Sequence, residues 1–269
     1  MTAPTGTPGT ALGPDGQRVF TKTRDGAPPH FFDREAVGLR ALGAAGARVP
    51  EVLDVSDTSI VLAWVEQGGH RTAASEERFG QELATLHRTT AQEARTGPGR
   101  SFGSVDGEPT AYLGACPVDL IPTRTWHESW VERRVVPLAR RARNAGHLDA
   151  QTAALAERID ADRLGPPEPP TLVHGDLWGG NRLVDDRGRS WLVDPCAHRG
   201  HREVDLAMMQ LFGGFSGRAL AAYVEVHPLA PGWQERVPVY QTVPLLVHAI
   251  LFGGAYGVQA GDALREAVR

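Results

Sequence analysis

The chain has 269 residues, of which 41% are hydrophobic and 22% charged, with a formal net charge of −4 and a pI near 6.2. This length allows one large domain or two closely packed lobes around a real core. The slightly acidic balance argues against a nucleic-acid-binding protein, which would usually carry a basic face. No apolar run is long enough to cross a bilayer, so we expect no membrane partner.

The first ten residues, MTAPTGTPGT, have neither the basic nor the apolar region of a signal peptide, and their composition predicts a loop or disorder. Cys116 and Cys196 are the only cysteines and lie far apart. Two such thiols make neither a disulfide framework nor a zinc site, and free thiols are typical of a reducing compartment. The sequence therefore predicts a cytoplasmic protein.

The first 66 residues alternate between strand and helix patterns. Pro14–Gly16 is typical of a hairpin turn, and the β-forming residues of Gln17–Lys22 predict a strand after it. His30–Ala45 has the apolar spacing of a helix, and Arg48–Glu66 reads as two further strands around a turn. We therefore expect residues 1–66 to form a small lobe with an antiparallel sheet and one helix.

Helices dominate the expected structure from residue 67 onwards. A helix begins at a predicted N-cap, Ser75, and a Gly- and Pro-rich segment follows it. Further helical patterns cover Thr125–Gly146, Asp149–Leu164 and the apolar stretch Val243–Gly257, which predicts a buried helix. The basic run from Arg133 to Arg143 favours a solvated helix face over an anion-binding face. The fold class is thus α+β and bilobal, with a mainly helical lobe over residues 67–269.

A cluster of acids and amides lies between short apolar runs in the stretch LVHGDLWGGNRLVDDRGRSWLVDP, residues 172–195. Asp176 and Asn181 share one tight loop, and a predicted hairpin then returns the chain, so that Asp194 comes close to Asn181. Carboxylate and amide oxygens suit a hard divalent cation such as Mg²⁺, which is commonly shared with phosphate oxygens. The spacing therefore predicts a magnesium site of Asn181 and Asp194.

The order of these residues matches the kinase catalytic loop and the metal-binding segment that follows it. That order begins with a base Asp, which is followed after four residues by an Asn and then by a hairpin that leads to a metal-binding Asp. A histidine lies two residues before the base. His174 stands at that position. An Asp and an Asn at this spacing would by themselves be weak evidence for a kinase, since a polar turn could contain both by chance. The complete order predicts that Asp176 is a catalytic base.

A kinase also needs a strand lysine for the nucleotide phosphates and a helix glutamate to orient it. Lys22 ends the strand of the N-terminal lobe, and Glu35 lies in the first turns of the next helix. The stretch VLAWVEQG, residues 61–68, is placed to be the hinge between the lobes. Its backbone predicts an adenine-binding edge at Ala63, Trp64 and Val65. The expected cofactors are ATP and Mg²⁺.

Several longer stretches resemble the fructosamine kinase family, the relatives of fructosamine-3-kinase and ketosamine-3-kinase. They are HGDLWGGN from His174, GHREVDLAM from Gly200 with the LFGGF after it, and the earlier FFDREAVGLRAL, ARVPEVL, LATLHR and TWHESWVERRVVP. The resemblance covers nearly the whole chain. Aminoglycoside and choline kinases share the His-Gly-Asp, Asn and Asp skeleton, but usually neither Trp178 nor the Gly-His-Arg-Glu run.

The resemblance implies a protein-kinase-like fold and ATP-dependent phosphorylation of a sugar hydroxyl on a ketoamine, as a step of deglycation repair. Asp176 would act on the 3-hydroxyl, Trp178 would form an apolar wall for the acceptor, and Asp205 would bond the catalytic loop or cap a helix. The residues implied on the acceptor side are His201, Arg202 and Glu203. The substrate would be a small ketoamine or a glycated amine or protein, and the protein a monomer or weak dimer.

The N-terminus departs from the family pattern. Members of the family generally have an earlier strand and a glycine-rich nucleotide loop before the lysine strand, so here we expect the first strand to be missing or degenerate. Two alternatives follow from the residues. One is a phosphotransferase of the aminoglycoside or choline type that acts on another alcohol, and the other is a truncated kinase-like protein that binds ligands without turnover.

Overall fold

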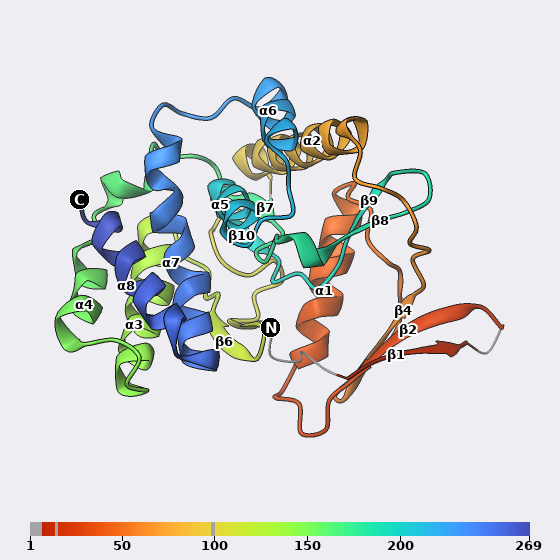
Figure 1. Ribbon diagram of the computed structural model, residues 1–269, viewed down its shortest axis with the longest axis horizontal. Helices are drawn as coiled ribbons and strands as arrows, with labels where there is room; N and C mark the ends of the chain where they lie inside the picture. Colours follow the sequence, from red (N-terminus) through yellow and green to blue (C-terminus); the bar gives the residue numbers. More distant parts are fainter. Residues whose placement is uncertain (1–6, 14–15, 98–99) are drawn as a thin grey trace.

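The structure is a computed structural model that describes residues 7–13, 16–97 and 100–269. A sheet with one helix lies beside a larger, mainly helical part (Figure 1). The smaller part contains β1 (Thr7–Leu12), β2 (Arg18–Thr23), α1 (Phe31–Ala44), β3 (Val52–Ser56) and β4 (Ser59–Ala63). Its sheet has the order β1-β2-β4-β3 with antiparallel neighbours. The predicted boundary at residue 66 falls between β4 and the first helix of the larger part.

The first strand is present. β1 pairs with β2 along its whole length, from Thr7 opposite Thr23 to Leu12 opposite Arg18. The expectation of a missing or degenerate strand, and of a loop at Thr7–Thr10, is therefore wrong. Pro8 and Gly9 are poor strand formers, but β2 supplies a complete set of backbone partners for this segment. Residues 1–6 and the Pro14–Asp15 part of the predicted turn lie outside the described residues.

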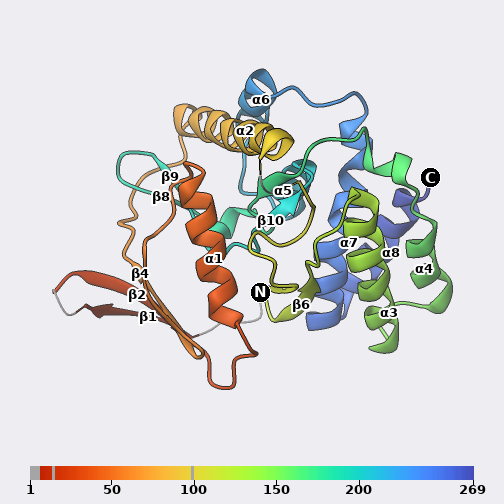
Figure 2. The same cartoon turned by 180° about the vertical axis from the view of Figure 1, so that it is seen from behind.

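The larger part is built mainly from helices, as Figures 1 and 2 show. Its α-helices are α2 (Ala73–Thr96), α3 (Val136–Asn144), α4 (Ala150–Ala154), α5 (Glu203–Leu211), α6 (Gly217–Val226), α7 (Trp233–Phe252) and α8 (Ala255–Ala267). A π-helical segment, η1 (Glu128–Val135), leads into α3, and short 3₁₀ turns are η2 (Leu155–Arg158), η3 (Ala161–Leu164) and η4 (Gly179–Asn181). α2 packs along α6, and α7 packs between α8, α3 and α5.

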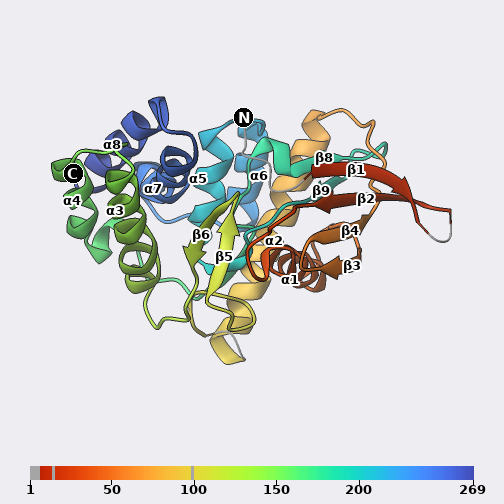
Figure 3. The same cartoon turned by 90° about the horizontal axis from the view of Figure 1, so that it is seen from below.

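Three small antiparallel pairs connect these helices. They are β5 (Thr110–Leu113) with β6 (Cys116–Asp119), β7 (Thr171–Val173) with β10 (His198–Gly200), and β8 (Arg182–Val184) with β9 (Ser190–Leu192). The β5–β6 hairpin lies between α1 and the helices of the larger part (Figure 3). This hairpin and β10 were not predicted, because their segments are short and rich in Gly, Pro and polar residues.

Two predicted helices differ in detail. Thr72, not Ser75, caps α2, since the backbone N–H of Ser75 donates to Thr72 Oγ1 at 3.2 Å. The pattern over Asp149–Leu164 breaks into α4 and two 3₁₀ turns. The late apolar stretch is a buried helix as predicted, with Val243, Leu246 and Val247 among its buried residues. Within the described residues, no helix is both long and apolar enough to cross a membrane.

Candidate active site

The β8–β9 hairpin brings together the three residues predicted from their order. Its register sets Arg182 opposite Leu192, so Asn181 comes next to Val193, whose N–H donates to the Asn181 carbonyl at 3.1 Å. Asn181 Nδ2 donates to the Asp176 carbonyl at 2.9 Å and to Asp176 Oδ2 at 3.0 Å. Asp194 follows directly after Val193. The side chains of Asp176, Asn181 and Asp194 therefore line one cavity.

A buried aspartate holds the backbone of the catalytic loop. Asp205 on α5 accepts hydrogen bonds from the N–H groups of His174 at 2.8 Å and Gly175 at 2.9 Å, and it contacts His87 Nε2 at 3.2 Å. His174 is itself buried, and its Nε2 lies 3.0 Å from the Val193 carbonyl. Burial lowers the pKa of His174, so the ring is neutral. The structural role predicted for Asp205, bonding the catalytic loop, is confirmed.

Asp176 has the electrostatic properties of a base that works near neutral pH. Partial removal from water and the nearby charge of Asp194 raise the pKa of Asp176 to about 7, and the hydrogen bond from Asn181 acts in the opposite direction. A carboxylate is a weak proton acceptor at its ordinary pKa and a better one when that pKa approaches the working pH. The position and the pKa of Asp176 both suit proton abstraction from a hydroxyl.

Lys22 extends from β2 into the same cavity. Its Nζ lies 2.7 Å from Glu35 Oε1 on α1 and also contacts Asp194 Oδ1. Burial disfavours the charged ammonium, but the two carboxylates outweigh this and raise the pKa of Lys22. The amine is therefore a fixed cation, and only 4% of the residue is exposed. Lys22 is also the only lysine among the 269 residues.

Asn181 and Asp194 offer oxygen atoms that fit a hard divalent cation. The Asn181 amide nitrogen is held by Asp176, and Asp194 Oδ1 contacts Lys22, which leaves Asn181 Oδ1 and Asp194 Oδ2 for a cation. Asp194 has a φ of 55°, a left-handed conformation that costs a non-glycine residue about 1–3 kcal/mol. Within the described residues no three His, Cys, Asp or Glu side chains cluster as a metal site.

The cavity has a volume of about 490 Å³ and is lined by Trp178, as expected, and by further aromatic residues that were not predicted. Trp178 lies edge-on to Phe212, with ring centroids 6.3 Å apart, and Phe212 packs against His248. The remaining aromatic residues of this wall, contributed by α7 and α8, are Phe252 and Tyr256. The only hint in the sequence was a histidine within the apolar pattern of α7.

Glycines allow the Trp178 ring to lie where it does. A Cβ on Gly180 would come within 2.2 Å of the Trp178 ring, so a larger residue would displace it. Gly179 packs against Gly214, and Arg71 ties the two segments by donating to the carbonyls of Gly179, at 2.7 Å, and Gly214. The catalytic loop and the Phe212-bearing segment thus form one packed unit.

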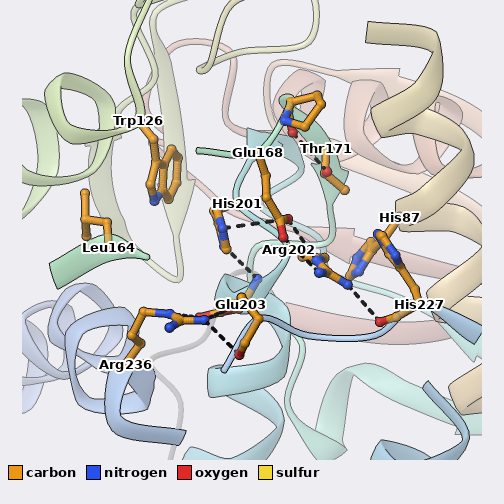
Figure 4. A network of polar contacts seen from close by, with 12 residues as sticks. His87, Trp126, Leu164, Glu168, Thr171, His201, Arg202, Glu203, His227 and Arg236 are labelled. Atoms are coloured by element: carbon orange, nitrogen blue, oxygen red, sulfur yellow. Dashed lines mark hydrogen bonds and ion pairs between the residues drawn. The ribbon is translucent and has the colours of Figure 1, made fainter. Parts of the chain in front are cut away.

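The structure does not bring His201, Arg202 and Glu203 to the cavity. They are buried at 2%, 3% and 3% exposure, and none of them lines it. Figure 4 shows Arg202 paired with Glu168, at 2.8 Å, and Glu203 paired with Arg236, at 2.6 Å. The expectation that they line the acceptor side is wrong for this structure, because β10 turns the chain into the core before α5 begins. Their contacts instead fix the connectors around Glu168 and Pro228.

We predict that this buried region makes folding acid-sensitive. Burial lowers the pKa of His198 to about 3 and of His201 to about 4, whereas an unfolded histidine titrates near pH 6.5. Below pH 6.5 the unfolded chain therefore binds more protons than the folded chain. Each ring should then lower the free energy of unfolding by about 1.4 kcal/mol for each unit by which the pH falls. Urea titrations between pH 7 and 5 would measure this slope. His201→Gln should make the slope shallower, and an equal slope would contradict the assignment.

The predicted adenine-binding segment follows β4. Val65 is buried, Ala63 and Trp64 are half-buried, and none of the three lines the cavity described above. Trp64 Nε1 donates to Glu66 at 2.9 Å, and Arg18 lies over its ring at 4.1 Å. The structure thus places Ala63 at the end of β4 and Trp64 and Val65 on the connection to α2, and their nucleotide contacts stay a prediction.

Known proteins resemble this chain along its whole length. A family model described as fructosamine kinase matches residues 7–269. A protein of Thermus thermophilus named as a probable ketoamine kinase is 36% identical over 89% of this chain and 83% of its own. The corresponding protein of Enterococcus faecium is 33% identical over 92% and 86%. A rice protein named as a protein-ribulosamine 3-kinase is 28% identical over 95% and 74%.

Solved structures agree with this relationship. A crystal structure of a Thermobifida fusca protein assigned as fructosamine-3-kinase has 38% identity and a TM-score of 0.84, covering 98% of this chain and 93% of that one. A choline kinase of Streptococcus pneumoniae, at 14% identity and a TM-score of 0.57 over 93% of this chain and 86% of that one, shares the fold alone. The fold is the bilobal protein-kinase-like fold that was predicted. The chain therefore belongs to the fructosamine kinase family.

Proposed function

We propose that this protein transfers the γ-phosphoryl group of ATP to a sugar hydroxyl of a ketoamine, the adduct that forms when a sugar glycates an amine, in deglycation repair. The observation that carries the proposal is the convergence of Lys22, Asp176, Asn181 and Asp194 on one cavity. A base, a fixed cation and oxygen donors for a metal are the parts that phosphoryl transfer requires.

In this proposal Asp176 accepts the proton of the acceptor hydroxyl as its oxygen attacks the γ-phosphorus. The bond between that phosphorus and the oxygen bridging to the β-phosphate breaks, and ADP leaves. Lys22, oriented by Glu35, donates to the nucleotide phosphates. Asn181 and Asp194 would hold Mg²⁺, which supplies neutralisation of phosphate charge.

The lining of the cavity favours a cationic acceptor with an apolar part. Five carboxylates line it against the two cations Lys22 and Arg34. A ketoamine carries a secondary ammonium group, which this charge attracts and which aromatic rings also bind favourably. An aminoglycoside, as a polycation, would suit the acidic lining as well and is the second candidate. The aromatic wall beside Asp176 favours the ketoamine.

A screen of ATP consumption tests the proposal. It would compare ketoamines of three- to six-carbon sugars with the parent sugars, with choline and with aminoglycosides. We expect turnover with ketoamines above all other acceptors and a product that carries one phosphate on the sugar. Turnover only with an aminoglycoside or choline would show that the acceptor belongs to that class and not to the ketoamines. Absence of turnover with every acceptor would favour a protein that binds ligands without catalysis.

We predict that Trp178→Ala changes acceptor use more than nucleotide use. Loss of the ring should raise KM for the ketoamine roughly 10-fold, equivalent to about 1.4 kcal/mol, and leave KM for ATP unchanged. Steady-state kinetics with each substrate varied would measure both constants. Trp233→Ala, at the start of α7 and away from the cavity, is the matched control. Equal losses on all acceptors and on ATP would argue against the wall role.

Other expectations from the sequence stay predictions. They concern the cytoplasmic location, the monomer or weak dimer, the lack of nucleic-acid and membrane partners, and a substrate that is a small ketoamine or a glycated amine or protein.

A further inference from the structure

The end of α1 nearest Glu35 is held by an inserted loop of the larger part. Arg34 Nη1 donates to both carboxylate oxygens of Asp106, each at 2.8 Å. The Tyr112 hydroxyl donates to the Pro29 carbonyl at 3.1 Å, and the rings of Tyr112 and Phe31 lie 5.1 Å apart. Three contacts thus join the first turn of α1 to the segment of residues 104–112.

The loop that carries Asp106 is anchored in the larger part. Gly103 exchanges two backbone hydrogen bonds with Arg199 of β10, at 2.9 and 2.7 Å, and the Ser104 N–H donates to the Leu120 carbonyl at 2.8 Å. Within the loop, Ser104 Oγ accepts from Gly107 N–H, and Asp106 Oδ1 accepts from the N–H of residue 108. The carboxylate of Asp106 is therefore oriented before it meets Arg34.

The Arg34–Asp106 pair differs from an ordinary surface ion pair. The Arg34 side chain is 14% exposed and its Nε is buried without a hydrogen-bond partner, whereas the Asp106 side chain is 34% exposed. Fully exposed pairs contribute little, but removing Asp106 from this partly buried pair leaves the Arg34 charge without a carboxylate partner. Among the described residues, Asp106 is the only carboxylate that pairs with Arg34. Loss of Asp106 should therefore release this end of the helix.

The position of α1 matters for Lys22, because Glu35 directly follows Arg34 on this helix. Glu35 orients Lys22, and in kinases this lysine–glutamate pair works only when its helix is correctly placed. Further along α1, Gly38 packs closely on Pro195 and Ala197, just after Asp194. The middle of the helix is thus set by close packing, while its first turn depends on the loop of residues 104–112.

We propose that Asp106 and Tyr112 are positioning residues, which hold α1 so that Glu35 keeps Lys22 directed at the nucleotide phosphates. This inference rests on the proposed function, because it assigns Lys22 to the nucleotide. Both residues line the same cavity as Lys22, and the charge of Asp106 is neutralised there by Arg34. Their loss changes ATP constants through the position of α1.

The test uses Asp106→Asn, Arg34→Met, the double variant and Tyr112→Phe in the full chain. Calorimetry with Mg²⁺-ADP gives nucleotide affinity without an acceptor, and steady-state kinetics gives KM for ATP and for the ketoamine. We expect Asp106→Asn and Arg34→Met each to weaken Mg²⁺-ADP binding and raise KM for ATP about 10-fold, with the ketoamine KM within twofold. Tyr112→Phe should act in the same direction with a smaller change.

The double variant should be no worse than either single variant, since both remove the same contact. Controls are Arg40→Met on the exposed face of α1 and Asp57→Asn in the exposed β3–β4 turn, both with wild-type binding. Additive losses, or a raised ketoamine KM with unchanged nucleotide affinity, would overturn the inference. A wild-type protein that binds no Mg²⁺-ADP would overturn the proposed function as well, whereas normal wild-type binding that Asp106→Asn leaves intact would overturn the positioning role alone.

Discussion

Asp176→Asn is expected to reduce kcat by about 10²- to 10⁴-fold while the fold stays intact. The substitution removes the proton acceptor and leaves the side-chain volume almost unchanged. Asn181 Nδ2 can still donate to the backbone carbonyl of residue 176, so the loop keeps one of its two hydrogen bonds. KM for ATP should change little, because the proposed mechanism assigns Asp176 to the acceptor hydroxyl and not to the nucleotide phosphates.

The measurement is single-substrate kinetics with saturating ATP, with thermal unfolding to check the fold. Asp186→Asn is the matched control, because Asp186 is exposed on the β8–β9 hairpin and does not line the cavity. Turnover close to wild type in Asp176→Asn would remove Asp176 from the role of base.

Lys22→Ala is expected to lower kcat/KM for ATP by about 10²- to 10³-fold, by analogy with the loss of one preorganised donor to a reacting oxyanion. The nucleotide phosphates would lose a fixed cation, and the carboxylates of Glu35 and Asp194 would face each other without a partner. This repulsion should also lower the melting temperature of the ligand-free protein. Kinetics with ATP varied and thermal unfolding without nucleotide would measure the two effects.

Lys22→Arg separates the two effects. The guanidinium keeps the charge between the carboxylates, so stability should return toward wild type. Its planar shape differs from that of an ammonium, so ATP kinetics should remain impaired. Unchanged ATP constants in Lys22→Ala would contradict the assignment of Lys22 to the nucleotide, whatever happens to stability.

The catalytic loop could be predicted from sequence because its geometry is local. Asp176 and Asn181 share one loop, and a short hairpin links Asn181 to Asp194, so the spacing alone limits the distances between them. Lys22 and Glu35 come from a strand and the following helix, and the required order was enough to pair them. Asp205 is some thirty residues from the loop that it holds, and its role followed from the family resemblance.

Other features depend on contacts that the sequence pattern does not contain. β1 has weak strand propensity and exists because β2 offers it a partner along its full length. His201, Arg202 and Glu203 follow Asp194 closely in sequence, yet the pairing of β10 with β7 carries them into the core. Part of the aromatic wall comes from α7 and α8. The apolar residues of these helices serve the core and the cavity alike, and burial alone does not distinguish them.

The presence of a single lysine affects how readily the enzyme itself is glycated, which is the damage that it is proposed to repair. Reducing sugars attach to lysine ε-amines, and the one such amine in this chain is buried between Glu35 and Asp194. All its other strongly basic side chains are arginines. A sugar-rich environment would therefore leave the surface without ε-amine adducts that compete for the cavity.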